Sequence, residues 1–199
     1  MPRKAKLILP FAPLPDLMGW WQSQNTPGIL IGGLAVALLG RPRLTRDVDV
    51  MVLLPQDRWE SFFKSSSDFG FTPREPDSLA FAREARVLLL RHEPSGIDVD
   101  VAFGFLPFEE EAVARATPTK VAGVSVPLPT PEDLIIMKAV AHRDRDALDI
   151  DGLLAAHPKL DLRRVRRWVK AFAEALELPA IWDDLKKQLA RRPKRKRGK

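Results

Sequence analysis

The chain contains no cysteine and no hydrophobic run long enough to cross a bilayer. Without cysteine it has no disulfide bond, no thiolate zinc site and no cysteine nucleophile. No apolar stretch reaches the roughly 18 residues that a transmembrane helix needs. The apolar run near the N-terminus is also too short for a signal peptide. We therefore expect a cytoplasmic protein with no membrane partner.

Several catalytic motifs are missing as well. The three histidines, His92, His142 and His157, lack the spacing of a metal site or a catalytic triad. Neither a Walker lysine motif nor a GxGxxG fingerprint occurs. What is present is enough apolar material for a core: 45% of the 199 residues are hydrophobic. The length fits one domain, or one domain with a helical appendage.

Positive charge is concentrated at the C-terminus. The net charge is +6, whereas residues 191–199 alone carry seven positive charges, so the rest of the chain is nearly neutral. Like charges repel and this segment has nothing apolar to bury, so we expect it to be disordered. Such a tail suits RNA binding, and the alternative is a tail that only improves solubility.

The most informative pattern is a pair of glycines between two short strands. Residues 28–31 form an apolar run that predicts a buried strand, and Gly32 and Gly33 follow it. Glycine lets the backbone approach a ligand closely and tolerates positive φ. Residues 34–39 then predict a helix whose free N–H groups point back at the glycines, which favours anion binding.

Two strands carry paired aspartates. Alternation over 47–53 places Asp47 and Asp49 on one face, where their like charges repel unless a cation lies between them. Residues 97–103 repeat the pattern with Asp98 and Asp100. Asp100 is the preferred third carboxylate because a clean apolar strand continues on both sides of it, and Asp98 is the alternative.

Basic residues accompany the aspartates. The loop 41–46 contains three arginines and ends at Arg46, directly before Asp47, which suits a site that holds polyphosphate and metal together. The alternative is simple salt bridging to the aspartates. Lys138 lies among apolar positions of a helix that begins after Thr130, so it needs a phosphate or an aspartate as partner, unless it extends to the surface. Asp146 and Asp149 are interpreted as structural residues.

The remaining secondary structure is predicted from periodicity and from turn residues. Helices are expected over 13–24, 55–69 and 105–116 and from residue 130 onward, strands over 71–81 and 85–90, and a hairpin over 120–129.

Together these pieces indicate phosphoryl chemistry. Three carboxylates can hold two Mg²⁺ ions through oxygen ligands, and such a pair supports in-line nucleotidyl transfer from an NTP. In this scheme Asp47, Asp49 and Asp100 are the catalytic and metal-binding residues. Glycine amides and arginines hold the triphosphate.

These residues carry a resemblance to a known superfamily. Gly32-Gly33, thirteen intervening residues and then Asp47-Val48-Asp49 resemble the signature of DNA polymerase β-like nucleotidyltransferases. The second glycine stands where serine is more frequent in that superfamily. Within it, Gly-Gly-Leu-Ala-Val followed by Leu-Thr-Arg-Asp-Val-Asp is similar to the abortive-infection toxin (AbiEii-like) branch, as are the later residues 130–138 and 143–149. The resemblance covers about residues 28–155.

The resemblance implies an α+β nucleotidyltransferase fold with a mixed sheet, with core 1–129, helical domain 130–190 and basic tail 191–199. It implies Mg²⁺ bound by Asp47, Asp49 and a third aspartate, and nucleotide contact by Lys138. Some toxins of the branch extend tRNA, so RNA and a cognate antitoxin are expected partners, with a protein hydroxyl or a small molecule as other acceptors. The alternative is a non-catalytic module that keeps the fold and binds nucleotide, RNA or a partner protein.

Overall fold

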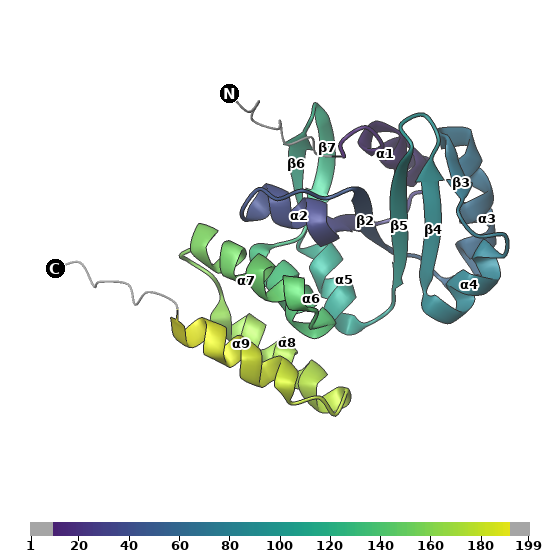
Figure 1. The fold of residues 1–199 in the computed structure, drawn as a ribbon. Helices are drawn as coiled ribbons and strands as arrows, with labels where there is room; N and C mark the ends of the chain where they lie inside the picture. The colour runs from purple at the N-terminus through teal and green to yellow at the C-terminus, as the bar shows by residue number, and fades with distance from the viewer. Residues whose placement is uncertain (1–9, 192–199) are drawn as a thin grey trace, which may run out of the picture. The chain divides into compact units, whose positions relative to one another are not determined.

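A computed structural model describes residues 10–191 and divides them into two compact units (Figure 1). The first unit runs to Ala37 and resumes from Pro42 to Thr130. The second unit takes Leu38–Arg41 and everything from Pro131 onward. Each unit has its own buried residues.

The first unit is built on a five-stranded mixed sheet. The strand order is β1-β2-β5-β4-β3, with only β2 and β5 parallel. The strands are β1 (Gly28–Ile31), β2 (Asp47–Leu53), β3 (Phe71–Pro73), β4 (Val87–His92) and β5 (Ile97–Gly104). A separate antiparallel hairpin follows, formed by β6 (Thr117–Val121) and β7 (Val124–Leu128).

Five helices and two 3₁₀ turns join these strands. They are α1 (Leu14–Ser23), α2 (Gly32–Leu39), η1 (Gln56–Arg58), α3 (Trp59–Ser65), η2 (Ser66–Phe69), α4 (Ser78–Ala85) and α5 (Pro107–Ala114). The mixed sheet with flanking helices confirms the predicted α+β class.

The two faces of the central strands differ sharply. On one face Val48 lies opposite Val99 and Val50 lies opposite Val101, and all four are fully buried. Aromatic rings extend this apolar face, since Trp59 of α3 stacks on Phe103 of β5 with a centroid distance of 4.0 Å. Because side chains alternate along a strand, the aspartates of β2 and β5 lie on the opposite face.

The predicted strand over 71–81 is wrong beyond its first three residues. Strand β3 ends at Pro73, and α4 begins at Ser78. Pro73 and Pro76 lack the N–H group that a strand ladder requires, whereas the alanine-rich sequence after Ser78 favours a helix. Helix α4 ends at Ala85, and the next residue, Arg86, has a left-handed φ of 56°.

The second unit is helical, as predicted from residue 130 onward. Its helices are α6 (Pro131–Ala141), α7 (Asp144–Ala156), α8 (Leu162–Ala175) and α9 (Ala180–Arg191). Helix α8 is strongly amphipathic: Val165, Val169 and Ala173 are buried, and basic residues occupy the exposed side. The side chain of Asp161 caps it by accepting hydrogen bonds from the backbone N–H groups of Arg163 and Arg164.

Two expectations concern the ends of the chain and the membrane. Of the predicted basic tail, only Arg191 belongs to the described part, where it is the last residue of α9, and 192–199 lie outside it. Between residues 10 and 191 no helix is both long enough and apolar enough to span a membrane.

Candidate active site

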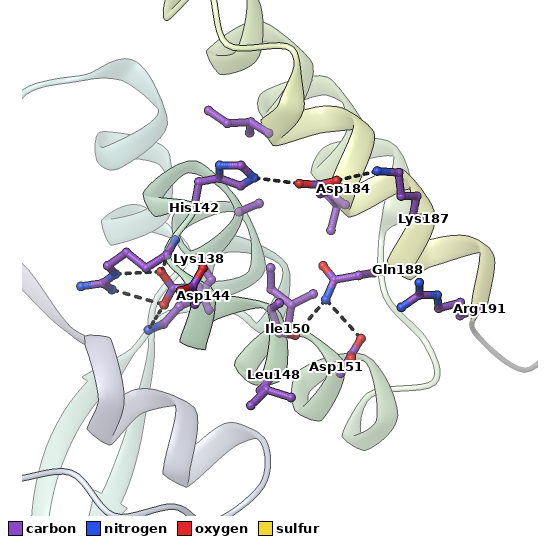
Figure 2. Close-up of a pocket in the computed structure, with 16 residues that line it drawn as sticks. Lys138, His142, Asp144, Leu148, Ile150, Asp151, Asp184, Lys187, Gln188 and Arg191 are labelled. Carbon is purple, nitrogen blue, oxygen red and sulfur yellow. Dashed lines mark hydrogen bonds and ion pairs between the residues drawn. The ribbon is translucent and has the colours of Figure 1, made fainter.

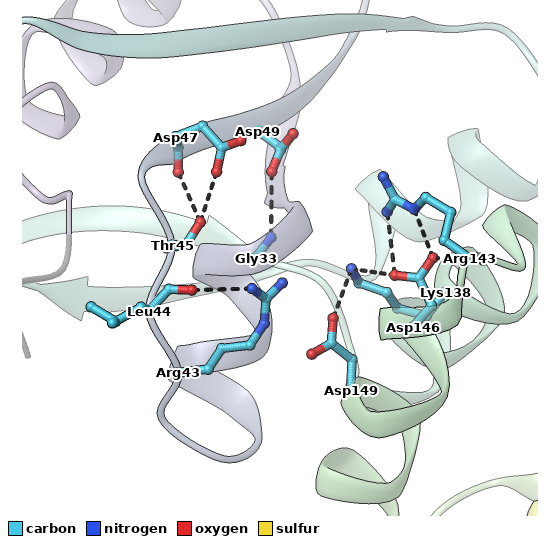
Figure 3. A network of polar contacts seen from close by, with 10 residues as sticks. All are labelled: Gly33, Arg43, Leu44, Thr45, Asp47, Asp49, Lys138, Arg143, Asp146 and Asp149. Carbon is cyan, nitrogen blue, oxygen red and sulfur yellow. Dashed lines mark hydrogen bonds and ion pairs between the residues drawn. The ribbon is translucent and has the colours of Figure 1, made fainter.

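The glycine pair is where strand, loop and helix approach one another most closely. Gly32 has a φ of 65°, a conformation that side chains disfavour, and its backbone lies against the Asp49 carboxylate. A Cβ atom on Gly33 would lie 2.7 Å from Oγ1 of Thr45 and 2.9 Å from Nη2 of Arg43. The backbone N–H of Gly33 donates to Oδ2 of Asp49 at 3.3 Å (Figure 3). Position 32 therefore requires glycine, whereas a side chain at position 33 would force Thr45 and Arg43 to shift.

Four aspartates form one row across β2 and β5, which we call the acidic row. Parallel pairing places Asp47 opposite Asp98 and Asp49 opposite Asp100. All four side chains are half-buried. Since neighbouring strands are about 4.8 Å apart, the structure brings together the three predicted carboxylates and the alternative one on a single face.

The members of the acidic row have different surroundings. Oδ1 of Asp47 accepts a hydrogen bond from Oγ1 of Thr45 at 2.7 Å (Figure 3). Asp100 contacts the guanidinium of Arg74 directly. Burial raises the pKa of Asp100 to about 6; Arg74 opposes this rise, and the charges of Asp49, Asp47 and Asp98 add to it. The row therefore holds more negative charge than its surroundings stabilise.

The acidic row has the chemistry of a divalent-cation site but not its finished geometry. Carboxylate oxygens are the ligands that Mg²⁺ prefers, and a cation would relieve the mutual repulsion of the four aspartates. Between residues 10 and 191, however, no three acidic or histidine side chains are already arranged to hold a metal ion. Arg74 contacts one oxygen of Asp100.

Two arginines lie near the row: Arg43, one of the three arginines of the basic loop, and Arg74, which no sequence pattern indicated. Arg43 is half-buried beside Gly33, whereas the predicted Arg46 is exposed. Arg74 reaches both Asp98 and Asp100 from the segment after β3. The loop 41–46 did indicate a basic site, but spacing alone does not tell which arginine turns inward. Arg74 falls in the segment that was wrongly predicted as a strand.

The predicted nucleotide ligand Lys138 lies in the second unit and is 3% exposed. Its Nζ atom lies 2.9 Å from Oδ1 of Asp146 and 3.0 Å from Oδ2 of Asp149 (Figure 3). The sequence analysis allowed a phosphate or an aspartate as the partner of Lys138, and the structure shows two aspartates. Burial raises the pKa of Asp146, but hydrogen bonds from Arg143 and Lys138 outweigh it and leave the pKa below its usual value.

A cavity of about 520 Å³ lies in the same unit, between α9, the end of α6 and the start of α7 (Figure 2). Ile150, Ile181 and Leu185 form its apolar floor. Across its mouth Nε2 of His142 lies 3.1 Å from Oδ2 of Asp184. The cavity is mixed in charge and its polar groups largely pair with one another.

Comparison with known proteins gives one family and a consistent fold. A family profile described as "Nucleotidyltransferase of unknown function (DUF6036)" matches residues 18–186. No curated protein shows significant similarity in sequence. The family match does not extend to the abortive-infection branch.

Several solved structures share the architecture. An antigenic nucleotidyltransferase-like protein from Paracoccidioides brasiliensis is 16% identical with a TM-score of 0.52, over 87% of this chain and 89% of that one. ANT(2'')-Ia in complex with adenylyl-2''-tobramycin is 18% identical with a TM-score of 0.52, over 82% of this chain and 96% of that one. The lincosamide antibiotic adenylyltransferase LnuA, lincomycin-bound, is 15% identical with a TM-score of 0.51, over 73% of this chain and 97% of that one. At these identities the likeness establishes the nucleotidyltransferase fold.

Proposed function

The chain belongs to the nucleotidyltransferase family DUF6036, and from this premise we propose that it transfers a nucleoside monophosphate from an NTP to a hydroxyl acceptor. The observation that carries the proposal is the acidic row, which lies in register on two parallel strands beside a glycine turn. Like charges placed side by side destabilise a sheet, so their pairing favours a site that a cation completes.

We propose that Asp47, Asp49 and Asp100 hold the metal. When bound, Mg²⁺ supplies charge neutralisation for the attacking and leaving oxygens. Gly33 and Arg43 lie next to each other at the start of α2, and this placement supports a phosphate-binding role for both. To bind phosphate, the N–H of Gly33 would release Oδ2 of Asp49, to which it donates in the metal-free protein. Arg46 and Lys138 remain predicted nucleotide ligands.

The transfer itself is an in-line displacement. The acceptor oxygen forms a bond to the α-phosphorus, the bond from that phosphorus to the β-phosphate oxygen breaks, and pyrophosphate leaves. Asp100 is the proposed base for the acceptor proton.

Two acceptor classes are supported by different observations. The neighbours ANT(2'')-Ia and LnuA are described with an adenylylated tobramycin and with lincomycin, so a hydroxyl-bearing small molecule is one class. RNA is the other class. It is the acceptor expected if the chain is a toxin of the AbiEii-like branch, and such a toxin would have a cognate antitoxin as its protein partner. Its support in the described residues is the exposed basic side of α8.

A transfer assay with α-labelled NTPs tests the proposal. Each of the four NTPs is offered with Mg²⁺ and either total tRNA or a panel of aminoglycosides and lincosamides. We expect the wild type to label one acceptor class and Asp49→Asn to lower the rate by about 100-fold or more. Asp57→Asn, an exposed carboxylate outside the row, is the matched control and should leave the rate unchanged.

Equal labelling by wild type and Asp49→Asn would contradict the proposal. Binding of nucleotide without magnesium dependence and without turnover on any acceptor would favour the non-catalytic alternative.

A further inference from the structure

Arg74 is placed to neutralise the acidic row without any bound ion. Its backbone N–H donates to the carbonyl oxygen of Leu89 at 3.0 Å, which anchors the segment just after β3. From there its Nη1 atom lies 3.2 Å from Oδ2 of Asp98, and its Nη2 atom contacts Oδ1 of Asp100. One guanidinium thus bridges both aspartates of β5.

The bridge uses an atom that a metal ion would need. Oδ1 of Asp100 accepts from Arg74, so a cation that binds this oxygen must displace or share it. The bridge also leaves Arg74 incompletely satisfied. Its Nε atom is buried and, within residues 10–191, has no hydrogen-bond partner. A buried donor without an acceptor is unfavourable, so moving the side chain outward would release that cost.

We propose that Arg74 is the resident counter-ion of the acidic row: it occupies Asp100 in the metal-free protein and competes with a divalent cation for that carboxylate. This inference rests on the proposed function, because it takes Asp100 to be a metal ligand. Arg74 is then a residue that sets cation affinity. Its charge opposes the incoming ion, and its departure exposes the oxygen.

Arg91 shows what a merely structural ion pair in this region looks like. Its Nη1 atom lies 2.9 Å from Oδ1 of Asp98, and its side chain is 47% exposed, against 27% for Arg74. No contact joins Arg91 to Asp100 within residues 10–191. The two arginines therefore share Asp98 as a partner and differ in their reach to Asp100, which makes Arg91 the matched control.

Binding of Mn²⁺ to the metal-depleted full-length chain tests the inference without any turnover. Free Mn²⁺ is measured by electron paramagnetic resonance for wild type, Arg74→Met and Arg91→Met. Removing a positive charge a few ångströms from a divalent ion strengthens binding, so we expect Arg74→Met to bind Mn²⁺ about tenfold more tightly than wild type. Arg91→Met should stay within about twofold of wild type, since its charge is more exposed and screened.

Stability in EDTA gives a second readout. Arg74→Met should unfold at a lower temperature than Arg91→Met. Adding Mn²⁺ should raise the unfolding temperature of Arg74→Met by more than it raises that of Arg91→Met. Should Arg74→Met not fold, Arg74→Gln carries the test, because it removes the charge and keeps one hydrogen bond to an aspartate.

Affinity for Mn²⁺ that is unchanged or weaker in the Arg74 variants would overturn the inference. So would the absence of Mn²⁺ binding in every variant. A different result would contradict the proposed function alone. In that result the wild type transfers no nucleotide, while the Arg74 variants still bind Mn²⁺ more tightly than wild type does.

Discussion

At Gly32 a left-handed backbone conformation lies directly beside the acidic row. Gly32 combines a left-handed φ with direct approach of the Asp49 carboxylate, so any side chain there is both strained and obstructed. Gly123, in the turn between β6 and β7, has a φ of 90° and open space around it. Comparing alanine substitutions at these two glycines therefore separates the cost of a left-handed backbone from the cost of a steric clash with Asp49.

We expect Gly32→Ala to lower the free energy of unfolding by about 3 kcal/mol or more, since a left-handed alanine costs about 1–2 kcal/mol and overpacking adds about 1–3. Gly123→Ala should show only the strain, about 1–2 kcal/mol. Urea unfolding measures both. Equal losses would mean that the Asp49 carboxylate moves aside without cost.

Asp100 makes a second prediction at the same scale, from the sign of its pKa shift. The pKa is about 6 in the folded protein against 3.8 for an ordinary aspartate. Between these values the folded state binds the proton more tightly than the unfolded state, so stability falls as pH rises from about 4 to about 6. At neutral pH the ionised carboxylate is therefore destabilising.

Replacing Asp100 with asparagine removes this penalty. In EDTA at pH 7.5 we expect Asp100→Asn to be more stable than wild type by about 1–2 kcal/mol, a figure reduced for the partial exposure of the carboxylate. Its stability should also vary less between pH 4 and 6. Urea unfolding across that range tests this, with Asp57→Asn as control; a profile identical to that of wild type would contradict it.

At the scale of the helical elements, the buried cluster of Lys138, Asp146 and Asp149 joins α6 to α7. The three side chains are at most 5% exposed, so each charge depends on the others for stabilisation. Arg143 adds a fourth charge, with its Nε atom 2.8 Å from Oδ2 of Asp146. The cluster holds the start of one helix against the side of the other.

Lys138→Met should cost about 3–5 kcal/mol of unfolding free energy, because it removes the buried cation that two buried carboxylates share. Lys187→Met is the control: that lysine pairs with Asp184 on the exposed side of α9, and its loss should leave the midpoint unchanged. Chemical denaturation at pH 7 measures the difference. If Lys138→Met is as stable as wild type yet loses nucleotide binding, the role of Lys138 is nucleotide contact rather than joining the helices.

At the scale of the whole molecule, the acceptor question depends on where positive charge is exposed. The outer side of α8 carries Arg163, Arg166, Arg167 and Lys170 within eight residues, and Arg163 and Arg166 make no ion pair with any residue in the described range 10–191. If RNA is the acceptor, these charges should release counterions when it binds.

We expect the double variant Arg163→Gln with Arg166→Gln to weaken single-stranded RNA binding and to make the slope of log K against log salt less steep by about 1.4. Fluorescence anisotropy at several salt concentrations measures this. Lys64→Gln with Lys120→Gln removes the same charge from the first unit and is the control. An unchanged slope in the α8 variant would argue against RNA on this helix and favour a small-molecule acceptor.

Elements whose signals are local could be predicted from the amino-acid sequence. Strict alternation placed Asp47 with Asp49, and Asp98 with Asp100, and β2 and β5 confirm both assignments. The glycine turn, the hairpin around Gly123 and the helices after Thr130 were likewise readable, because turn residues and side-chain periods act over a few positions.

Which of these elements meet follows from the folded sheet and not from any local pattern. The parallel pairing of β2 with β5, which brings Asp49 beside Asp100, joins residues about fifty positions apart, and no local pattern encodes it. The same holds for Arg74, which reaches Asp100 only because β3 ends early and the chain turns back into α4. Alternation follows from the stereochemistry of neighbouring residues, whereas strand order follows from how the whole sheet buries its apolar face.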